Sequence, residues 1–307
     1  MATVPKSRRS RSVSPTDPRP YVRLLERRLP GLAIRRVRAI DTGWAYFVLE
    51  VNGAWIFRFP RTLEVSRKLE PEIRLLGELE GRLPVPVPHY EWVVRNSNGR
   101  IRFAGYPKLH GRSLPSRNLG GPEARRWISD LTATLRALLR FPRARAQRLA
   151  VTWSYRTTGV ERWRWLYPRI RRRVHPLLPA AVRYRDRTYW EQYLHDPARK
   201  QIRPVLNHGD LFPEHILVTD RGVSGILDWE DACYEDPVGN LAGLPTADSF
   251  ADQVAEGYLA EGDPGFGTRL AFHRHATWAY PMVFGLENRD TGRVREALAR
   301  YERTLPA

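Results

Sequence analysis

The stretch His208–Leu217, HGDLFPEHIL, holds the densest group of potentially reactive side chains in this sequence. A second segment, Gly225–Trp229 (GILDW), places Asp228 eighteen residues after Asp210. From Val205 to Asn240 there are eight acidic residues and a single basic one, Arg221, in a chain whose net charge is +18. An acidic island in a basic protein needs a local reason, and a bound metal or a cationic ligand would supply one.

Two aspartates and a histidine at this spacing suit phosphoryl transfer. That reaction needs a carboxylate that orients the acceptor hydroxyl and takes its proton, and ligands for the magnesium ions on the phosphates. A kinase catalytic loop supplies them as H-x-D-x-x-x-x-N, followed by an aspartate on the next hairpin. Here Asp210 fits the base and Asp228 the metal ligand, while His215 stands at the usual Asn position. The alternatives are a plain turn at Asp210, a turn carboxylate at Asp228, and a His215 that holds the loop or bonds a phosphate oxygen.

The first hundred residues read as a small antiparallel sheet with one inserted helix. Asn52-Gly53 is a strong hairpin signal, because both turn positions tolerate positive φ. A short helix is expected over 21–29, and a longer one starts near Glu64, after the third strand, and stops before the proline-rich LPVPVP. The alternating segments predict strands over 32–40, 45–51, 54–59, 89–95 and 100–105.

The remainder is mainly helical, with short strands over 205–228. Gly121-Pro122-Glu123 opens a helix with proline at its first position. Further helical patterns cover roughly 160–174, 182–195, 247–261, 268–285 and 291–304. These patterns predict an α+β fold of two lobes, a five-stranded antiparallel first lobe with one helix and a larger, mainly helical second lobe. The expected boundaries are a disordered basic tail over 1–19, a first lobe over 20–105, a connecting segment over 106–111, and a second lobe over 112–307 that carries the candidate catalytic hairpin at 205–240.

HGDLFPEHIL together with GILDWEDACYEDPVGNLA resembles the aminoglycoside phosphotransferase superfamily, and within it the macrolide phosphotransferases most closely. Those enzymes also tend to carry histidine at the Asn position. The segments Trp55–Arg61 and 64–88 look like that group's third strand and following helix. The resemblance covers roughly residues 32–110 and 204–245 and is weak over 112–200, where acceptor specificity would be built.

The resemblance implies a protein-kinase-like fold and a nucleotide site. Arg58 takes the place of the kinase lysine that touches the phosphates, and Glu72 that of its helix partner, although Glu72 also suits a solvated helix charge. Gly43 lies in the loop of the first hairpin, which has one glycine where kinases have G-x-G-x-x-G. The hinge that would bind the base is matched by Tyr106, Pro107, Lys108 and Leu109. The implied cofactors are GTP or ATP, with GTP favoured in the macrolide group, and Mg²⁺.

Two of these positions depart from the kinase pattern. Arginine contacts phosphate through a larger planar fork than lysine does, so Arg58 is not a neutral replacement. Histidine is a softer ligand than asparagine, and magnesium prefers oxygen, so His215 is an unusual magnesium ligand. These departures motivate one alternative, a pseudokinase or basic binding module that uses the fold without turnover.

The expected acceptor is a small molecule with a hydroxyl group and a protonated amine. The acidic residues Glu230, Asp231 and Glu235 are the candidate substrate-binding residues. A macrolide phosphorylated on its amino sugar is the leading substrate, and an aminoglycoside is the runner-up. A metabolic kinase acting on a choline-like or sugar substrate is a further alternative. The aromatic residues Trp153, Trp163, Trp165 and Tyr167 read as core, with an acceptor wall as the other interpretation.

Composition sets the remaining expectations. No apolar run approaches the roughly 18 residues that a membrane span requires, and no apolar segment of a signal peptide follows the basic start. The single cysteine, Cys233, is expected in the core; it allows no intrachain disulfide and favours a reducing cytoplasm. The enzyme is expected to be a monomer. The positive charge raises nucleic acid as a partner, but a solvated, arginine-biased surface explains it more simply.

Overall fold

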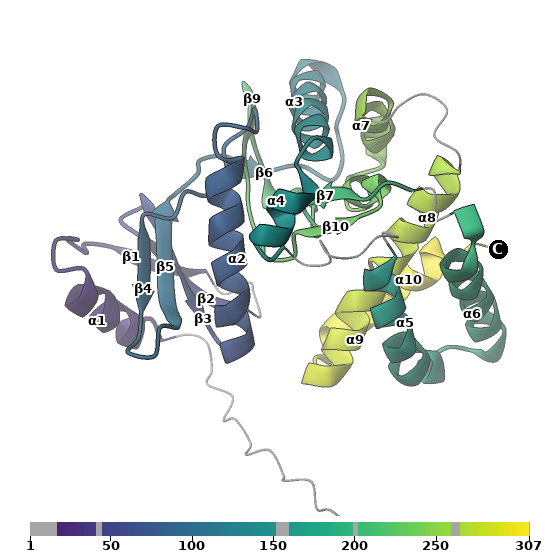
Figure 1. Cartoon of the computed structure of the whole chain (residues 1–307), viewed down its shortest axis with the longest axis horizontal. Helices are drawn as coiled ribbons and strands as arrows, with labels where there is room; N and C mark the ends of the chain where they lie inside the picture. Colours follow the sequence, from purple (N-terminus) through teal and green to yellow (C-terminus); the bar gives the residue numbers. More distant parts are fainter. Residues whose placement is uncertain (1–16, 41–44, 152–159, 199–201, 259–264, 307) are drawn as a thin grey trace, which may run out of the picture. The chain divides into compact units, whose positions relative to one another are not determined.

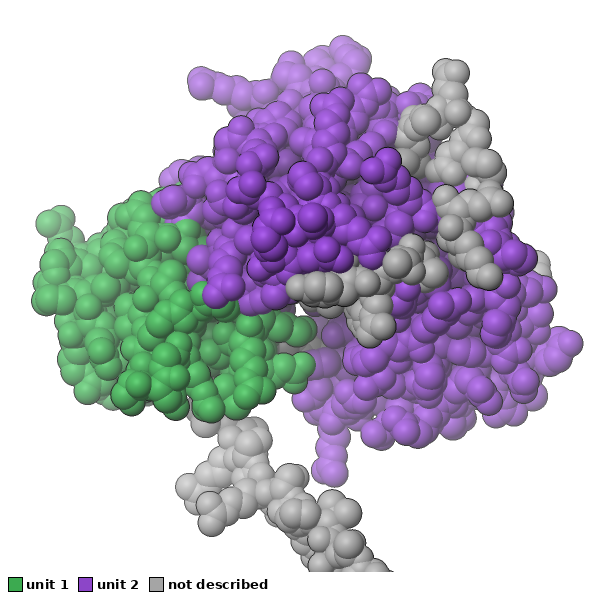
Figure 2. Space-filling view, in the orientation of Figure 1, with its two compact units in different colours: residues 1–70, 90–108 green, residues 71–89, 109–307 purple. Residues whose placement is uncertain are grey.

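The computed structural model describes residues 17–40, 45–151, 160–198, 202–258 and 265–306. The chain divides into two compact units, residues 1–70 with 90–108 and residues 71–89 with 109–307. Figure 2 colours the first green and the second purple.

The first unit contains the expected five-stranded antiparallel sheet, in the order β1-β2-β3-β5-β4. Helix α1 (Arg19–Arg28) lies against this sheet and contributes Leu24 and Leu25 to a core with Phe57 and Phe103 (Figure 1). Tyr21 of α1 stacks on Phe47, with ring centroids 4.0 Å apart. The strands are β1 (Val37–Ile40), β2 (Tyr46–Val51), β3 (Trp55–Pro60), β4 (Trp92–Arg95) and β5 (Ile101–Pro107).

The hairpin between β2 and β3 turns at Asn52-Gly53, as predicted, with φ of +57° and +71°. The side chain of Asn52 also explains why the strand expected over 32–40 begins only at Val37. Its Oδ1 accepts hydrogen bonds from the amides of Arg35 and Arg36, and its Nδ2 donates to the carbonyl of Ala33. The backbone before β1 therefore bonds to a turn side chain rather than to strand β2.

Helix α2 (Leu63–Leu79) follows the third strand, which confirms the inserted helix. Pro71 lies inside this helix, where it removes one backbone donor. The two compact units divide along the chain at this residue.

The second unit begins with two small sheets and the helices beside them. Strands β6 (Arg112–Ser113), β8 (Ile216–Thr219) and β9 (Gly222–Ile226) form one sheet, and β7 (Val205–Asn207) pairs with β10 (Cys233–Glu235). Helix α3 (Gly121–Leu139) packs against β9 and α7 (Phe250–Tyr258). The sequence reading did not anticipate β6 or the short helix α4 (Arg143–Arg148).

Five further helices share one apolar core: α5 (Glu161–Arg173), α6 (Ala180–His195), α8 (Phe266–Ala276), α9 (Ala279–Asn288) and α10 (Thr291–Thr304). The single helix expected over 268–285 is wrong, because the chain breaks between α8 and α9. Pro281 is the third residue of α9, and proline fits a helix's first turn but disrupts its interior. Trp163 and Tyr167 lie in this core, as expected, whereas Trp165 is exposed and Trp153 is outside the described residues.

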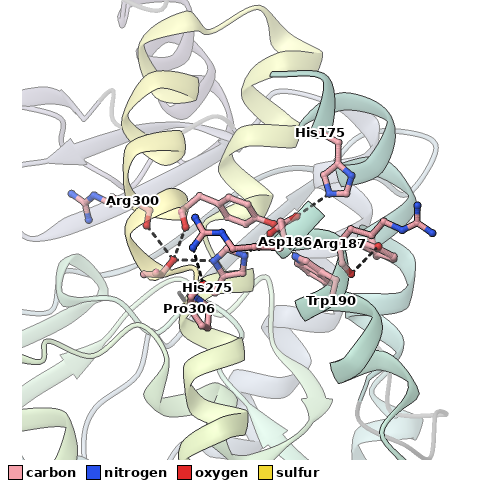
Figure 3. A network of polar contacts seen from close by, with 11 residues as sticks. His175, Asp186, Arg187, Trp190, His275, Arg300 and Pro306 are labelled. Atoms are coloured by element: carbon pink, nitrogen blue, oxygen red, sulfur yellow. Dashed lines mark hydrogen bonds and ion pairs between the residues drawn. The ribbon is translucent and has the colours of Figure 1, made fainter. Parts of the chain in front are cut away.

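A buried polar network crosses this helical core (Figure 3). The carboxylate of Asp186 on α6 accepts from Nε2 of His175 and Nε2 of His275, each at 2.8 Å. The indole of Trp190 donates to the hydroxyl of Tyr301 at 2.8 Å. These contacts join α6 to α8, α10 and the single turn η1 (His175–Leu177), so the polar groups help to fix how the helices pack.

The α+β fold class predicted from the sequence, with a five-stranded antiparallel sheet followed by a mainly helical part, is confirmed by this architecture. In the described part of the chain, no helix combines the length and the apolar character that crossing a membrane would require.

Candidate active site

The candidate catalytic loop, residues 208–215, follows strand β7 and requires glycine at position 209. Gly209 has φ of +87°, and a Cβ there would lie 1.9 Å from the carbonyl oxygen of Asp231. No other residue type fits this position without moving the 231–232 backbone. The close approach brings the segment before Asp210 against the segment after Asp228.

His208 is fully buried and ties the loop to its neighbours. Its Nε2–H donates to the carbonyl of Leu227 at 2.8 Å, and its Nδ1 accepts the amide of Asp210 at 3.3 Å. Burial lowers the pKa of His208 to about 3, so the ring is neutral. Because a carbonyl only accepts, Nε2 carries the proton and Nδ1 is free to accept.

The side chains of Asp210, His215 and Asp228 lie close to one another. Nδ1 of His215, in the single turn η3 (Pro213–His215), donates to the carbonyl of Asp210 at 2.8 Å. The same Nδ1 lies 3.5 Å from Oδ2 of Asp210, and Nε2 lies 3.7 Å from Oδ2 of Asp228. The side chains of Asp210 and Asp228 are each about two-fifths exposed, so both can meet a ligand.

Asp228 lies two residues after the end of strand β9, in the left-handed region, with φ of +62°. Non-glycine residues adopt this conformation at a cost, and such residues cluster at functional sites. Aspartate tolerates it better than most residues do. The backbone therefore holds this carboxylate in a direction that an ordinary extended strand would not provide.

The electrostatics of the cluster shift two of its groups. Burial, reinforced by Asp231 and Asp228, raises the pKa of Asp210 to about 6, although His215 opposes the shift. Burial lowers the pKa of His215, but the carboxylates of Asp228 and Asp210 outweigh it, so the pKa of His215 is raised. Because two carboxylates lie beside one imidazole, the cluster stabilises a positive charge, whether on the imidazole or on a bound cation.

The residues present fit a magnesium ion whose coordination is completed by phosphate and water. No group of three or more His, Cys, Asp or Glu side chains that could hold a metal occurs among the residues described here. Magnesium commonly takes only one or two protein carboxylates and fills its other positions with water and substrate phosphates. Asp228 supplies such a carboxylate, and Nε2 of His215 faces it because Nδ1 already bonds a carbonyl.

Asp236 and Asn240 are buried beside the loop and stabilise it through hydrogen bonds and an ion pair. Asp236 accepts the amide of Val238, at the start of η4 (Pro237–Leu241), and pairs with the buried Arg269 of α8 at 2.9 Å. Oδ1 of Asn240 accepts the amide of His208 at 2.9 Å, and Nδ2 donates to the carbonyl of Leu206 at 3.2 Å. Both residues are buried, as a supporting role requires.

The three acidic residues expected to bind substrate lie in different surroundings. Glu230 and Asp231 are half-buried and lie two and three residues after Asp228. Glu235 on β10 is only 3% exposed, and burial raises its pKa to about 7. Its burial does not suit contact with an acceptor, so we revise its role to support of the loop.

Arg162 is a residue of this site that sequence reasoning missed. It lies in the first turn of α5, in the region where no motif was recognised, and its Nη1 donates to the carbonyl of Gly209 at 3.0 Å. A lone arginine in an arginine-rich helix carries no distinguishing signal, so only the structure connects it to the loop.

The residues expected to bind nucleotide fall in both compact units. In the first unit, Arg58 on β3 is buried, lies 3.8 Å from the ring centre of Tyr46, and donates to the hydroxyl of Tyr90 at 2.9 Å. Lys108 pairs with Glu50 at 2.9 Å. Tyr106 and Pro107 end strand β5, and Gly43 is outside the described residues.

The second unit holds the other two residues of this predicted set. Glu72 is buried on α2. The side chain of Leu109 packs against Gly225, where an added Cβ would meet it at 2.8 Å. The pairing of Arg58 with Glu72 stays a prediction.

Comparison with known proteins assigns the chain to a family. Residues 37–272 match the model of the phosphotransferase enzyme family (APH), which is more than three quarters of the chain, so the protein belongs to this family. The GDP complex of wild-type aminoglycoside 2'-phosphotransferase-IIIa is 25% identical, with a TM-score of 0.84 over 94% of this chain and 98% of that one. The superfamily predicted from the sequence is therefore confirmed.

Two other likenesses are weaker. A macrolide 2'-phosphotransferase type I shares the fold, with 24% identity and a TM-score of 0.72 over 94% of this chain and 97% of that one. An uncharacterized Bacillus subtilis (strain 168) protein, YcbJ, is 26% identical over 193 residues. That match covers 60% of each chain, so it spans about three fifths of this curated relative.

Proposed function

We propose that this protein transfers the γ-phosphate of a nucleotide to a hydroxyl group of a small molecule that carries a protonated amine. The observation that carries the proposal is the cluster in which Asp210, His215 and Asp228 converge on a structurally constrained loop. Family membership supports the reaction type. The pseudokinase alternative finds no support in this cluster, because both carboxylates are present and accessible.

Asp210 is the proposed base. Its partly exposed carboxylate would accept a hydrogen bond from the acceptor hydroxyl, orient the oxygen toward the γ-phosphorus, and take the proton as the new bond forms. Magnesium bound by Asp228 and His215 would neutralise charge on the phosphates. The remaining contribution of the chain is positioning, which His208, Gly209 and Asn240 provide through the loop contacts described above.

The nucleotide is proposed to be GTP or ATP. The similarity to a GDP complex supports a guanine nucleotide, and adenine nucleotides occur in more distant structural neighbours. Arg58 is the proposed phosphate contact, Glu72 its partner, and Tyr106, Pro107, Lys108 and Leu109 the proposed base-binding segment.

The acceptor is proposed to be an antibiotic of the aminoglycoside or macrolide class. Higher structural likeness favours the aminoglycoside, whereas the loop motif with His215 favours the macrolide. Glu230 and Asp231 would attract the amine that both classes carry. A cytoplasmic location remains our proposal, with the single unpaired thiol of Cys233 in its support, and a monomer remains a proposal as well.

The test is release of nucleoside diphosphate by purified protein with Mg²⁺, using ATP and GTP separately against panels of both antibiotic classes. Mass spectrometry of the acceptor then shows whether it gained a phosphoryl group. Phosphorylation of a member of either class would support the proposal and identify the substrate. No phosphorylated acceptor in either panel would contradict the antibiotic assignment.

A further inference from the structure

Arg162 connects the helical part of the second unit to the catalytic loop. Its Nη1 donates to the carbonyl of Gly209 at 3.0 Å, one residue before Asp210. The same nitrogen lies 3.7 Å from Oε1 of Glu235 on β10. Arg162 thus contacts both the segment that holds Gly209 and the segment that holds Glu235. Asp231, four residues before Glu235, lies in close backbone contact with Gly209.

This arginine is held in a protein environment rather than in solvent. Its side chain is 15% exposed, and that of Glu235 is 4% exposed. The guanidinium carbon lies 5.2 Å from the ring centre of Trp163. Burial alone would lower the pKa of Arg162, but Glu235, Cys233 and Asp231 raise it, so the group stays charged.

The surrounding oxygens show why a cation is needed at this point. Oε2 of Glu235 and Oδ1 of Asn207 are buried without a hydrogen-bond donor among the described residues. A Cβ on Gly239 would lie 2.7 Å from Oε1 of Glu235 and 2.8 Å from Oδ1 of Asn207, so these acceptors crowd one position. The positive charge of Arg162, 3.7 Å from Oε1 of Glu235, offsets part of their negative potential.

From this geometry we propose that Arg162 is a positioning residue that orients Asp210 by anchoring the carbonyl of Gly209. It acts through the loop and does not touch either substrate. Its pairing with Glu235 keeps the guanidinium in place, which gives the buried carboxylate a structural role. The proposal rests on the proposed function for its kinetic consequences, but not for the loop order that it predicts.

A purely structural arginine is the competing interpretation. Removal would then lower overall stability and leave the loop as ordered as the rest of the protein. A positioning residue instead predicts a loss that is confined to the catalytic loop and to kcat. The two interpretations are separated by measurements on the folded protein.

The experiment compares Arg162→Met, Arg162→Lys and the control Arg172→Met. Arg172 lies in the same helix and is exposed. Hydrogen–deuterium exchange of the peptide covering residues 207–215 reports on the loop, and the peptide covering α10 serves as reference. Steady-state kinetics report kcat and KM for nucleotide and acceptor.

For Arg162→Met we expect faster exchange in residues 207–215, unchanged exchange in α10, and a fall in kcat of about a hundredfold with little change in the KM for nucleotide. Arg162→Lys, which keeps the charge but offers a single donor group, should recover part of kcat. Arg172→Met should match the wild type in every readout.

Unchanged loop exchange in Arg162→Met, or exchange that rises equally in α10, would overturn the proposal. Equal loss of kcat in the Lys and Met variants would overturn it as well. Failure of the wild type to turn over any acceptor would count against the proposed function alone, because the exchange comparison still tests the anchoring of the loop.

Discussion

The imidazole of His208 donates a hydrogen bond to the carbonyl of Leu227 at 2.8 Å. This contact joins the residue two positions before Asp210 to the residue just before Asp228. Since the ring also accepts the amide of Asp210, one neutral side chain sets the spacing between the proposed base and the proposed metal ligand.

Replacement of His208 by phenylalanine should therefore disturb both carboxylates. The tilted ring contact with Trp229 would be retained in part, but the carbonyl of Leu227 would lose its donor. A buried acceptor left without a donor costs about 1–3 kcal/mol, and we expect a loss of that size together with reduced kcat. Urea unfolding and steady-state kinetics check both effects, and unchanged stability would contradict this role for His208.

Gly209→Ala should be far more harmful than an alanine at another glycine. A Cβ at 209 meets the Asp231 carbonyl, whereas Gly267, on the exposed face of α8, has nothing within 4 Å of its Cβ position. Gly267→Ala should stabilise the protein by about 0.4–1 kcal/mol, because it reduces the freedom of the unfolded chain. Gly209→Ala should lower the melting temperature and abolish turnover. Comparable melting curves for the two variants would show that the close contact at 209 is not present.

Asp228→Asn should separate charge from backbone conformation. Asparagine tolerates the left-handed φ of +62°, so the fold should be kept, while the carboxylate that we assign to magnesium is lost. The concentration of Mg²⁺ needed for half-maximal turnover should rise at least tenfold. Titration of activity with Mg²⁺ measures this, with the circular dichroism spectrum as the check on folding. An unaltered magnesium requirement would remove Asp228 from the metal site.

Asp186→Asn should destabilise the helical core in a pH-dependent way. Burial raises the pKa of Asp186, but the hydrogen bonds from His175 and His275 outweigh it, and the pKa is lowered. A carboxyl whose folded pKa is depressed stabilises the protein above its unfolded pKa of about 3.8, and that stabilisation is lost as the pH falls through the folded value.

The difference in unfolding free energy between wild type and Asp186→Asn should therefore be on the order of 3 kcal/mol at pH 7 and shrink below about pH 4. The control Arg187→Ala removes an exposed pair with Glu191 and should change stability by less than about 0.5 kcal/mol. A difference that is constant from pH 7 to pH 3 would refute the assignment of a charged Asp186.

The parts of the fold that follow local rules could be predicted from the sequence. The Asn52-Gly53 turn and the helix 291–304 lie where residue patterns placed them, because turn chemistry and amphipathic spacing are local properties. Pro281 indicated a break between α8 and α9, but the continuous apolar pattern over 268–285 led to the prediction of a single helix. The late start of β1 was not readable, since it depends on hydrogen bonds from the distant side chain of Asn52.

The candidate site also has residues that the sequence predicted and residues that it did not. Asp210, His215 and Asp228 were found because their residue types and spacing are characteristic of one reaction, and the structure brings them together. Arg162 and the buried position of Glu235 were not found, because a contact between α5 and a loop some fifty residues later leaves no local pattern. The supporting role of Asn240 was not predicted either, because its bonds to His208 and Leu206 appear only in three dimensions.

The most direct test of the central claim is the rate of phosphoryl transfer by Asp210→Asn, measured beside Asp220→Asn at saturating nucleotide and acceptor. Asp220 is an exposed acid in the turn between β8 and β9, so its variant changes the net charge equally. Our account predicts a fall in kcat of about a hundred- to ten-thousandfold for Asp210→Asn, with nucleotide affinity unchanged, and no more than a small change for Asp220→Asn. A kcat for Asp210→Asn within a few-fold of the wild type would contradict the assignment of Asp210 as the base.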